Sequence, residues 1–204
     1  MASTDRMFKG QSAAERRAER KAKLDAAALE IIGTRGWGEA TMTEICRTAG
    51  LTERYFYESY RNRDELYLAL LDRLAEEVRD AIVGGLSTGP ADPRARIEAG
   101  ARALVDVMFG DPRIGRAALS EGLDTPVLQA KRRQIIQSLG TVIEEQRAAL
   151  FGPSPDPARA AMTIAAISGS TSELFIRRLE GRLDVDDAQL ARYLADAALA
   201  LLQV

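Results

Sequence analysis

The chain has 204 residues, a formal net charge of −2, a single cysteine and no histidine. The absence of histidine excludes His-based catalytic triads and His-ligated metal sites, and one thiol alone forms neither an intramolecular disulfide nor a thiolate cluster for zinc. A nearly neutral chain has no overall signature of a nucleic-acid-binding protein, so any affinity for DNA must come from a local patch.

Basic side chains gather at the start of the chain. Residues 1–24 contain seven Lys and Arg residues and three acidic residues, which gives this segment a net charge of +4. We expect a flexible arm at residues 1–11, and for residues 1–12 both DNA contact and a solubilising tail stay open. From Arg16 onward the pattern favours contact with phosphates, with Arg16 and Arg20 as the candidates.

The first helix is expected at about residues 12–35. Its apolar residues recur at helical spacing and form one stripe that covers the next two helices, made of Leu24, Ala27, Ala28, Ile31 and Ile32. Gly36 and Gly38 end this helix. Trp37 between them is expected to pack at the edge of the domain, and stacking on a DNA base is the alternative.

Two short helices joined by a tight turn follow. Thr41 and Glu44 have the spacing of a capping box, and Cys46 supplies a small apolar side chain that lets the second helix approach the first. Gly50 is able to adopt the left-handed backbone conformation of a tight bend, and Thr52 is expected to cap the next helix. Phe56 packs inward, which leaves on the outer surface Thr52, Glu53, Arg54, Tyr55 and Tyr57. This is the layout of a helix-turn-helix reader of duplex DNA.

The later helices are marked by their first residues. Asn62 and Glu65 form another capping box before a long helix from Arg63 to about Leu86. Four more helices begin where a cap residue precedes a proline, at Asp92-Pro93, Asp111-Pro112, Thr125-Pro126 and Asp156-Pro157. With a last helix at about 186–202 the total is nine, and no segment alternates as a strand does, so we predict an all-α fold. Loops are expected at residues 84–90 and 151–157.

The last two helices present faces that another helix can approach closely. One face consists mainly of small side chains and the other mainly of larger apolar ones. Such faces are either buried within the subunit or shared between two subunits. The residues that we assign to a dimer interface are Ala158, Ala161, Met162, Ala165, Tyr193, Leu194, Ala197 and Leu201.

Many apolar residues of the helices that begin at 93, 126 and 157 belong to an ordinary core. A polar run, Ser168 and 170–173, interrupts one of these helices and indicates a ligand cavity, because buried hydroxyl and carboxylate groups need partners. A place at the dimer interface or in solvent is the alternative. The residues that we assign to the cavity are Leu104, Met108, Phe109, Leu139, Val142, Ile143, Ile167, Thr171 and Leu174.

One pattern joins the residues from about Leu24 to Leu71. It comprises the first-helix stripe and then Gly36, Ala40, Thr41, Ile45, Ala49, Gly50, Leu51, Thr52, Tyr57, Tyr60, Arg63, Glu65 and Leu66. This pattern resembles the tetracycline-repressor (TetR) family of bacterial one-component regulators. The chain departs from the family pattern at Tyr55, where smaller residues are usual, and at Tyr60, which replaces a Phe.

The resemblance implies nine helices, with a three-helix DNA-binding domain at residues 12–62 and a ligand-binding and dimerisation domain at residues 63–204. It also implies a homodimeric repressor that binds a palindromic operator in double-stranded DNA and leaves it when a small, largely apolar effector binds. In this interpretation Arg54 and Tyr55 read base edges next to Glu53. Contacts with phosphates come from Thr41, Thr43, Thr52, Tyr57 and Arg63. No cofactor and no metal are expected.

Two other classes of protein stay open. An all-α protein-interaction adaptor explains the paired faces but gives no purpose to Arg54, Tyr55 and their neighbours. A helical enzyme without histidine would rely on a pair such as Glu173 and Arg177, which lie one helical turn apart. Such a pair is more often a surface salt bridge. We therefore expect that the protein is not an enzyme. No apolar run reaches the length of a membrane span and the N-terminus lacks a signal-peptide core, so we expect a cytoplasmic protein without a membrane partner.

Overall fold

The computed structural model describes residues 12–88, 92–119, 125–152 and 154–202. Within these ranges the chain forms nine α-helices and a short 3₁₀ helix, and no strand. The helices are α1 (Ala13–Arg35), α2 (Met42–Ala49), α3 (Glu53–Tyr57), α4 (Arg63–Thr88), α5 (Pro93–Gly110), α6 (Pro112–Leu119), α7 (Pro126–Phe151), α8 (Pro157–Leu179) and α9 (Asp187–Leu202), and η1 (Trp37–Glu39) follows α1. The predicted all-α, nine-helix architecture is confirmed, and the predicted arm at residues 1–11 lies outside the described residues.

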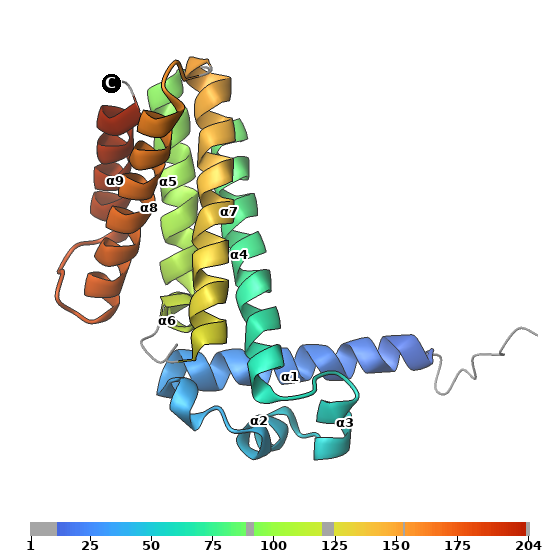
Figure 1. Ribbon diagram of the computed structural model, residues 1–204. Coiled ribbons are helices and arrows are strands. Elements are labelled where there is room, and N and C mark those ends of the chain that lie inside the picture. The colour runs from blue at the N-terminus through green and yellow to red at the C-terminus, as the bar shows by residue number, and fades with distance from the viewer. Residues whose placement is uncertain (1–11, 89–91, 120–124, 153, 203–204) are drawn as a thin grey trace, which may run out of the picture.

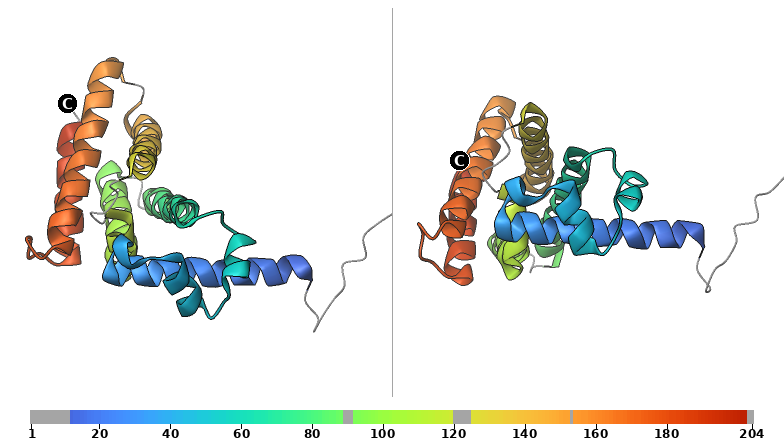
Figure 2. Two further views of the ribbon diagram at one scale, coloured as in Figure 1. Left: turned by 60° about the horizontal axis from the view of Figure 1, so that its bottom comes forward. Right: turned by 90° about the horizontal axis from the view of Figure 1, so that it is seen from below.

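The helices form a small head beneath an upright bundle. Figure 1 shows α1 lying across the base, with α2 and α3 below it, while α4 rises from the head beside α5 and α7. Helices α8 and α9 stand together at the outer edge of the bundle. Seen from below, α1 extends beyond the bundle on the side opposite this pair (Figure 2).

Most helix starts follow from the capping residues of the sequence. The side chains of Asp92, Thr125 and Asp156 each accept a hydrogen bond from a backbone N–H three residues on, at 2.9, 3.3 and 3.0 Å. The prolines that follow have no backbone N–H to donate. This costs nothing, because the N–H of a residue in the first turn has no acceptor within its own helix. These pairs fix where α5, α7 and α8 begin.

Three local predictions around the head are wrong in detail. Thr41 accepts from the backbone N–H of Glu44 at 3.2 Å, but the Glu44 carboxylate is held by Arg35 and Arg47 and does not complete the box. Thr52 stands at the N-cap of α3, yet its side chain makes no capping hydrogen bond. Ahead of α4, Glu65 accepts from the backbone N–H of Arg61 instead of that of the Asn62 cap.

The predicted loop at residues 84–90 is also wrong over residues 84–88. Helix α4 continues to Thr88, and the hydroxyls of Ser87 and Thr88 donate to the carbonyls of Val83 and Gly84 at 2.7 and 2.9 Å. Local hydrogen bonds of this kind keep polar side chains inside a helix. Residues 89–91 lie outside the described residues.

The core of the head reaches into the bundle. Buried residues of α1, α2, α3 and η1 share one apolar cluster with Leu66–Leu74 of α4, with Ala117 of α6 and with Leu128 of α7. Two further clusters fill the bundle between α4, α5, α8 and α9. Helix α4 therefore contributes to both the head and the bundle.

Helices α1 and α6 meet at very close range. A Cβ added to Gly33 of α1 would lie 2.5 Å from the Cβ of Arg113 in α6, so only glycine fits here. The guanidinium of Arg113 binds Glu30 of α1 at 2.7 Å and Asp111 at 2.6 Å. These two carboxylates raise the pKa of Arg113 above its ordinary value. The close approach and the ion pairs hold the head against the lower end of the bundle.

Candidate nucleic-acid interface and cavity

The turn between α2 and α3 has the predicted geometry. Gly50 adopts φ 65° and ψ 34°, the left-handed conformation, and the backbone N–H of Leu51 donates to the carbonyl of Cys46 at 2.9 Å. Phe56 is fully buried in the head core, where it contacts Tyr60 with ring centroids 5.9 Å apart. Burial of Phe56 fixes which face of α3 points inward, and so which face points out.

Five of the predicted DNA contacts lie on the outer face of the motif. Thr43 and Thr52 are exposed, the side chain of Arg54 is 85% exposed, and Tyr57 is 58% exposed. Glu53 is exposed as well and accepts a 3.4 Å hydrogen bond from the hydroxyl of Thr43, which links α3 to α2. The outer face of α3 therefore carries one exposed cation and one exposed aromatic ring.

Tyr55 and Arg20 contact each other instead of facing outward. The Arg20 guanidinium of α1 lies 4.5 Å from the centre of the Tyr55 ring, and its Nη2 is 3.0 Å from Glu58 Oε2. Arg17 donates to the backbone carbonyl of Glu58, and Arg54 pairs with the same Glu58 carboxylate at 3.6 Å. We call Arg17, Arg20, Tyr55 and Glu58 the α1–α3 brace. Sequence reasoning missed Arg17 and Glu58, whose separation of 41 residues leaves no local signal.

Arg63 and Trp37 form a second stack at the base of α4. The Arg63 guanidinium lies 4.4 Å from the centre of the Trp37 ring, and Trp37 stacks on Tyr67 with ring centroids 4.7 Å apart. Trp37 is buried. It therefore packs in the head as expected, and base stacking, the alternative interpretation, is contradicted.

The remaining predicted contacts lie nearby. Thr41 is exposed ahead of α2, and Arg16 is half-buried in the first turns of α1. Glu44 holds Arg35 and Arg47 at 2.7 Å each, and the hydrogen bonds from Arg47 and then Arg35 lower the pKa of Glu44 to about 2. Arg47, which sequence reasoning did not select, has an exposed side chain at the end of α2.

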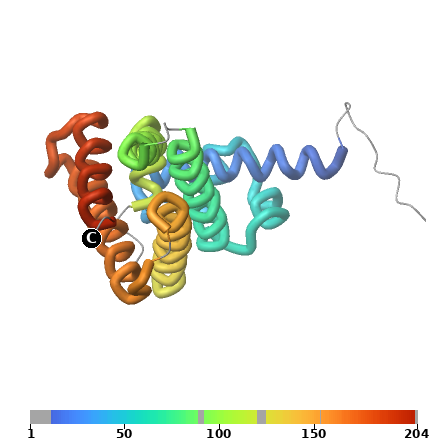
Figure 3. The backbone as a smooth tube through the Cα atoms, turned by 90° about the horizontal axis from the view of Figure 1, so that it is seen from above, coloured from blue at the N-terminus to red at the C-terminus, as the bar shows by residue number. Residues whose placement is uncertain are grey.

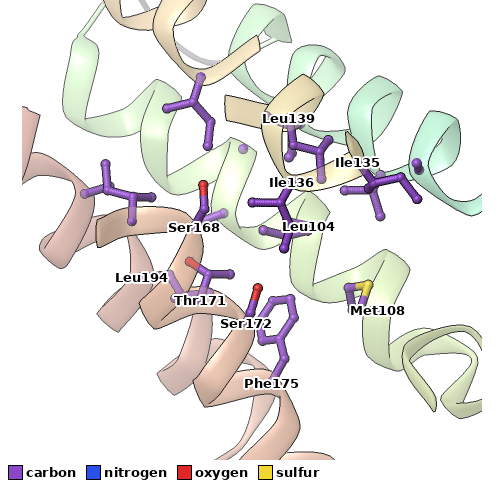
Figure 4. Close-up of a pocket in the computed structure, with 18 of the residues that line it drawn as sticks. Leu104, Met108, Ile135, Ile136, Leu139, Ser168, Thr171, Ser172, Phe175 and Leu194 are labelled. Atoms are coloured by element: carbon purple, nitrogen blue, oxygen red, sulfur yellow. The ribbon is translucent and has the colours of Figure 1, made fainter. Parts of the chain in front are cut away.

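A cavity of about 230 Å³ lies inside the bundle, between α4, α5, α7 and α8. Figure 4 shows Leu104, Met108, Ile135, Ile136 and Leu139 around it, with Ser168, Thr171 and Ser172 directed toward it from α8. Six of the nine residues predicted for a cavity line it, namely Leu104, Met108, Leu139, Ile143, Ile167 and Thr171.

The other three predicted cavity residues do not line it. Phe109 packs edge-on against Phe175 with ring centroids 5.1 Å apart and lies beneath the Arg178 guanidinium at 4.1 Å. Leu174 joins the apolar cluster between α4, α5 and α9, and Val142 is not one of the residues that line the cavity. From the polar run, Ser170 bonds to the carbonyl of Ala166 at 2.7 Å, and Glu173 pairs with Arg177 on the surface.

The outward face of α8 and α9 is apolar and exposed. Met162 is 66% and Tyr193 61% exposed, and the smaller members Ala158, Ala161 and Ala165 are exposed beside them. Ala197 is half-buried and Leu201 is 38% exposed. Leu194 differs, because it is buried within the subunit and lines the cavity, so it offers no surface to a partner. The view from above places this pair of helices along one edge of the molecule (Figure 3).

The features of the enzyme alternative do not converge. Glu173 and Arg177 form a 2.6 Å ion pair with half-exposed side chains, outside the cavity. Among the described residues, no three Cys, Asp or Glu side chains gather closely enough to hold a metal ion. No helix in the described ranges combines the length and the apolar composition that crossing a membrane requires.

Comparison with known proteins supports the helix-turn-helix interpretation. Residues 25–70 match the model of the family described as bacterial regulatory proteins, tetR family. The chain is 36% identical over 90 residues to the HTH-type transcriptional regulator BetI of Rhizobium meliloti, which is 44% of this chain and 41% of BetI. It is 34% identical over 95 residues to the HTH-type transcriptional activator FasR of Mycolicibacterium smegmatis, which is 47% of this chain and 43% of FasR. These matches span less than half the length of either curated relative.

Solved structures share the whole fold. The fatty acid degradation regulator FadR from Bacillus halodurans superposes with a TM-score of 0.71 at 16% identity, over 90% of this chain and 94% of that one. FadR from Bacillus subtilis, solved in complex with stearoyl-CoA, superposes with a TM-score of 0.70 at 12% identity, over 88% of this chain and 97% of that one. A tetR-family transcriptional regulator from Streptomyces coelicolor has a TM-score of 0.71 at 20% identity, over 90% of this chain and 80% of that one. Residues 25–70 thus carry the sequence pattern of the tetR family of bacterial regulatory proteins, within a fold that these solved regulators share.

Proposed function

We propose that the protein is a dimeric, DNA-binding transcriptional repressor that a small, largely apolar effector releases from its operator. The observation that carries the proposal is the outer face of α3, where Arg54 and Tyr57 are exposed above the buried Phe56. A short helix presented in this way fits the major groove, where Arg recognises the O6 and N7 acceptors of guanine. The protein is not an enzyme in this proposal, and it acts in the cytoplasm.

The head provides two kinds of DNA contact. Arg54 reads a base edge, with Tyr55 and Glu53 beside it, while Thr41, Thr43, Thr52 and Tyr57 contact phosphates and sugars. Arg16, Arg20 and Arg63 supply positive charge around this face, although Arg20 and Arg63 already lie on aromatic rings. The exposed side chain of Arg47 adds to the same positive charge. The DNA-binding domain spans residues 12–62 and the effector and dimerisation domain residues 63–204.

A dimer supplies the second head. The exposed apolar face of α8 and α9, with Met162 and Tyr193 at its centre, is the surface that we assign to the two-fold contact. A two-fold dimer places two α3 helices in successive major grooves of a palindromic operator. An effector that binds better to a dimer with another head spacing shifts the population away from the DNA-bound form. Differential affinity of about 5 kcal/mol moves such an equilibrium almost completely.

The relatives agree with the main features of this proposal. BetI is named as an HTH-type transcriptional regulator and FasR as an HTH-type transcriptional activator. Whether a bound dimer blocks or helps a promoter depends on where its operator lies. The B. subtilis FadR was solved with stearoyl-CoA, a ligand with a long apolar part, and this chain has an apolar cavity in the same fold.

The experiment is a gel shift with DNA that flanks the protein's own gene, followed by a salt titration. Arg54→Ala should relax the preference for one base pair, at a cost of about 1–3 kcal/mol. Arg63→Ala should weaken binding to all sequences alike and flatten the dependence on salt. Arg102→Ala, on the exposed side of α5, is the control. If both head variants bind the operator as tightly as the parent at every salt concentration, the proposed interface is wrong.

A further inference from the structure

We propose that the cavity of the bundle takes a linear hydrocarbon chain that ends in a single anionic group, bound by Arg132 and by the hydroxyls of Ser168, Thr171 and Ser172. This inference rests on the proposed function, because it treats the cavity as the effector site. It goes further in assigning a charge to the effector and a place to that charge.

The shape of the cavity favours a linear ligand. Along α4 its lining extends from Leu71 to Leu86, which at 1.5 Å per residue is about 22 Å. A volume of about 230 Å³ drawn out over this length leaves a narrow channel. Its walls consist mostly of Leu, Ile, Val and Ala side chains, so an extended hydrocarbon chain fills the channel without leaving polar groups unpaired.

Three hydroxyl residues lie on one face of α8 and line the cavity. The Oγ of Ser168 is buried and makes no hydrogen bond, and Thr171 and Ser172 follow it one turn further along the helix. By contrast, the hydroxyls of Thr141 in α7 and Ser170 in α8 donate to backbone carbonyls of their own helices, at 3.2 and 2.7 Å. A buried hydroxyl without a partner costs free energy, and a ligand group with lone pairs would remove that cost.

Arg132 lies at about the level of Ser172 on the opposite wall. Helices α7 and α8 run antiparallel and meet where Gly140 faces Ile164, since a Cβ on Gly140 would lie 2.9 Å from Ile164 Cγ2. Arg132 precedes Gly140 by eight residues and Ser172 follows Ile164 by eight, so both lie about 12 Å from that contact. The guanidinium and the hydroxyls thus form one polar region of the channel, and the other polar residues of its lining are Gln146 and Arg147.

Arg132 is the cavity cation whose charge is not already balanced within the described part of the chain. The second cation, Arg147, binds Glu144 at 2.7 and 2.8 Å and donates to the carbonyl of Gly152 at 3.0 Å. Arg132 has no ion pair there, while Asp72 is paired with Lys131 and Glu173 with Arg177.

The positions one turn away from Arg132 on α7 offer no carboxylate either, since they are Leu128, Gln129, Ile135 and Ile136. A partly buried guanidinium without a counter-charge is stabilised by a carboxylate or a phosphate, which it binds through two parallel hydrogen bonds. An anionic ligand group therefore satisfies Arg132 and the α8 hydroxyls together, which a neutral group does not.

The test is calorimetric titration of the full chain with ligands that share one chain length. Decanoate and decyl phosphate carry the two kinds of anion, decanol is neutral, and decyltrimethylammonium is cationic; all are used below the concentrations at which they aggregate. At least one anion should bind at least tenfold more tightly than decanol. Equal affinity for decanol, preference for the ammonium compound, or no binding of any of the four overturns the inference.

Two variants of α7 test whether the anionic group of the ligand binds at Arg132. Arg132→Met keeps the length of the side chain and should abolish the preference for the anion while changing the affinity for decanol less than twofold. Arg133→Met, on the exposed face of α7, is the matched control and should keep the preference. If Arg132→Met still prefers the anion as the parent does, the anion is not at Arg132 and the inference fails.

Ser168→Ala supplies a readout that a merely structural serine would not give. Removing an unpartnered buried hydroxyl should raise the Tm of the free protein and weaken decanoate binding several-fold. A lower Tm, or an unchanged affinity, contradicts a ligand-binding role. Because calorimetry needs no DNA, this inference can fail while the operator gel shift succeeds, and the gel shift can fail while the anion preference holds.

Discussion

The phenolic hydroxyl of Tyr67 in α4 donates a 2.7 Å hydrogen bond to the backbone carbonyl of Ala117 in α6, inside the protein. The next two residues of α6, Ala118 and Leu119, line the cavity. On its other side the Tyr67 ring stacks on Trp37, which carries the Arg63 guanidinium. A single buried side chain thus joins the cavity wall to the edge of the head.

Replacing Tyr67 by phenylalanine should destabilise the fold. The carbonyl of Ala117 loses its partner while the ring stack stays in place, and an unsatisfied buried acceptor costs about 1–3 kcal/mol. Urea denaturation measures this loss. Tyr57→Phe is the control, because Tyr57 is 58% exposed and its change should stay within about 0.5 kcal/mol. Equal effects of the two substitutions would contradict a role for the buried hydrogen bond.

A methyl group at Gly33 should push α1 away from α6. Gly33→Ala places a Cβ 2.5 Å from Arg113 Cβ, and overpacking of this kind costs about 1–3 kcal/mol or more. We expect a lower Tm and weaker operator binding, measured by thermal unfolding and gel shift. Gly38→Ala, whose added Cβ would meet no atom within 4 Å, should leave both nearly unchanged. A Gly33→Ala protein as stable as the Gly38→Ala protein would show that the two helices separate freely.

Several helix starts and the turn of the motif could be predicted from local features of the sequence. The starts of α5, α7 and α8 follow from an oxygen acceptor before a proline, and the bend of the motif follows from one glycine at residue 50. The inward face of α3 could be predicted from Phe56, because a large apolar residue on a five-residue helix has only the core to pack against.

The contacts between distant helices could not be predicted in this way. Arg20 looks like a phosphate ligand in a basic segment, and only the crossing of α1 over α3 places it on Tyr55. Leu194 and Tyr193 are adjacent in an apolar helix, and which of them faces the cavity depends on how α9 is rotated against α5. Phe109 has the composition of a cavity residue but packs on Phe175 instead. Such choices depend on helix packing, which periodicity alone does not fix.

The α1–α3 brace leads to a prediction about how operator affinity depends on salt concentration. If Arg20 positions α3 through Tyr55 and Glu58, Arg20→Gln should weaken operator binding without changing the slope of log affinity against log salt. A lost phosphate contact changes that slope by about one. Tyr55→Leu should cause a similar loss, and the double variant should lose little more than either single one. A flatter slope for Arg20→Gln would identify Arg20 as a phosphate ligand instead.

The ion pairs of Glu44 lead to a prediction about how the stability of the fold depends on pH. Hydrogen bonds from Arg47 and Arg35 lower the pKa of Glu44 to about 2, below its value of about 4.5 in an unfolded chain. The resulting stabilisation is present above about pH 4.5 and is lost as the pH falls towards 2. Urea denaturation of the parent and of Glu44→Gln should therefore differ at pH 7 and converge at low pH. Glu145→Gln on α7 is the control, and a difference independent of pH would contradict the prediction.

Tyr193 should be central to the dimer. Tyr193→Asp puts a charge on the exposed apolar face of α8 and α9, and loss of a central interface aromatic costs about 2 kcal/mol or more. Sedimentation at micromolar concentration should show monomers for this variant and dimers for the parent. Tyr57→Asp, equally exposed but on the head, should remain dimeric. A Tyr193→Asp protein that stays dimeric would place the two-fold contact elsewhere.

The burial of Cys46 has a practical consequence. It is the single cysteine of the sequence, it is 4% exposed, and burial raises the pKa of its thiol, so little reactive thiolate forms at neutral pH. A cysteine introduced at exposed Arg54 would then be the one thiol that a nitroxide or dye reagent modifies, with no need to remove the native one. In a dimer, a label at that position reports directly how far apart the two α3 helices stand, with and without a ligand in the cavity.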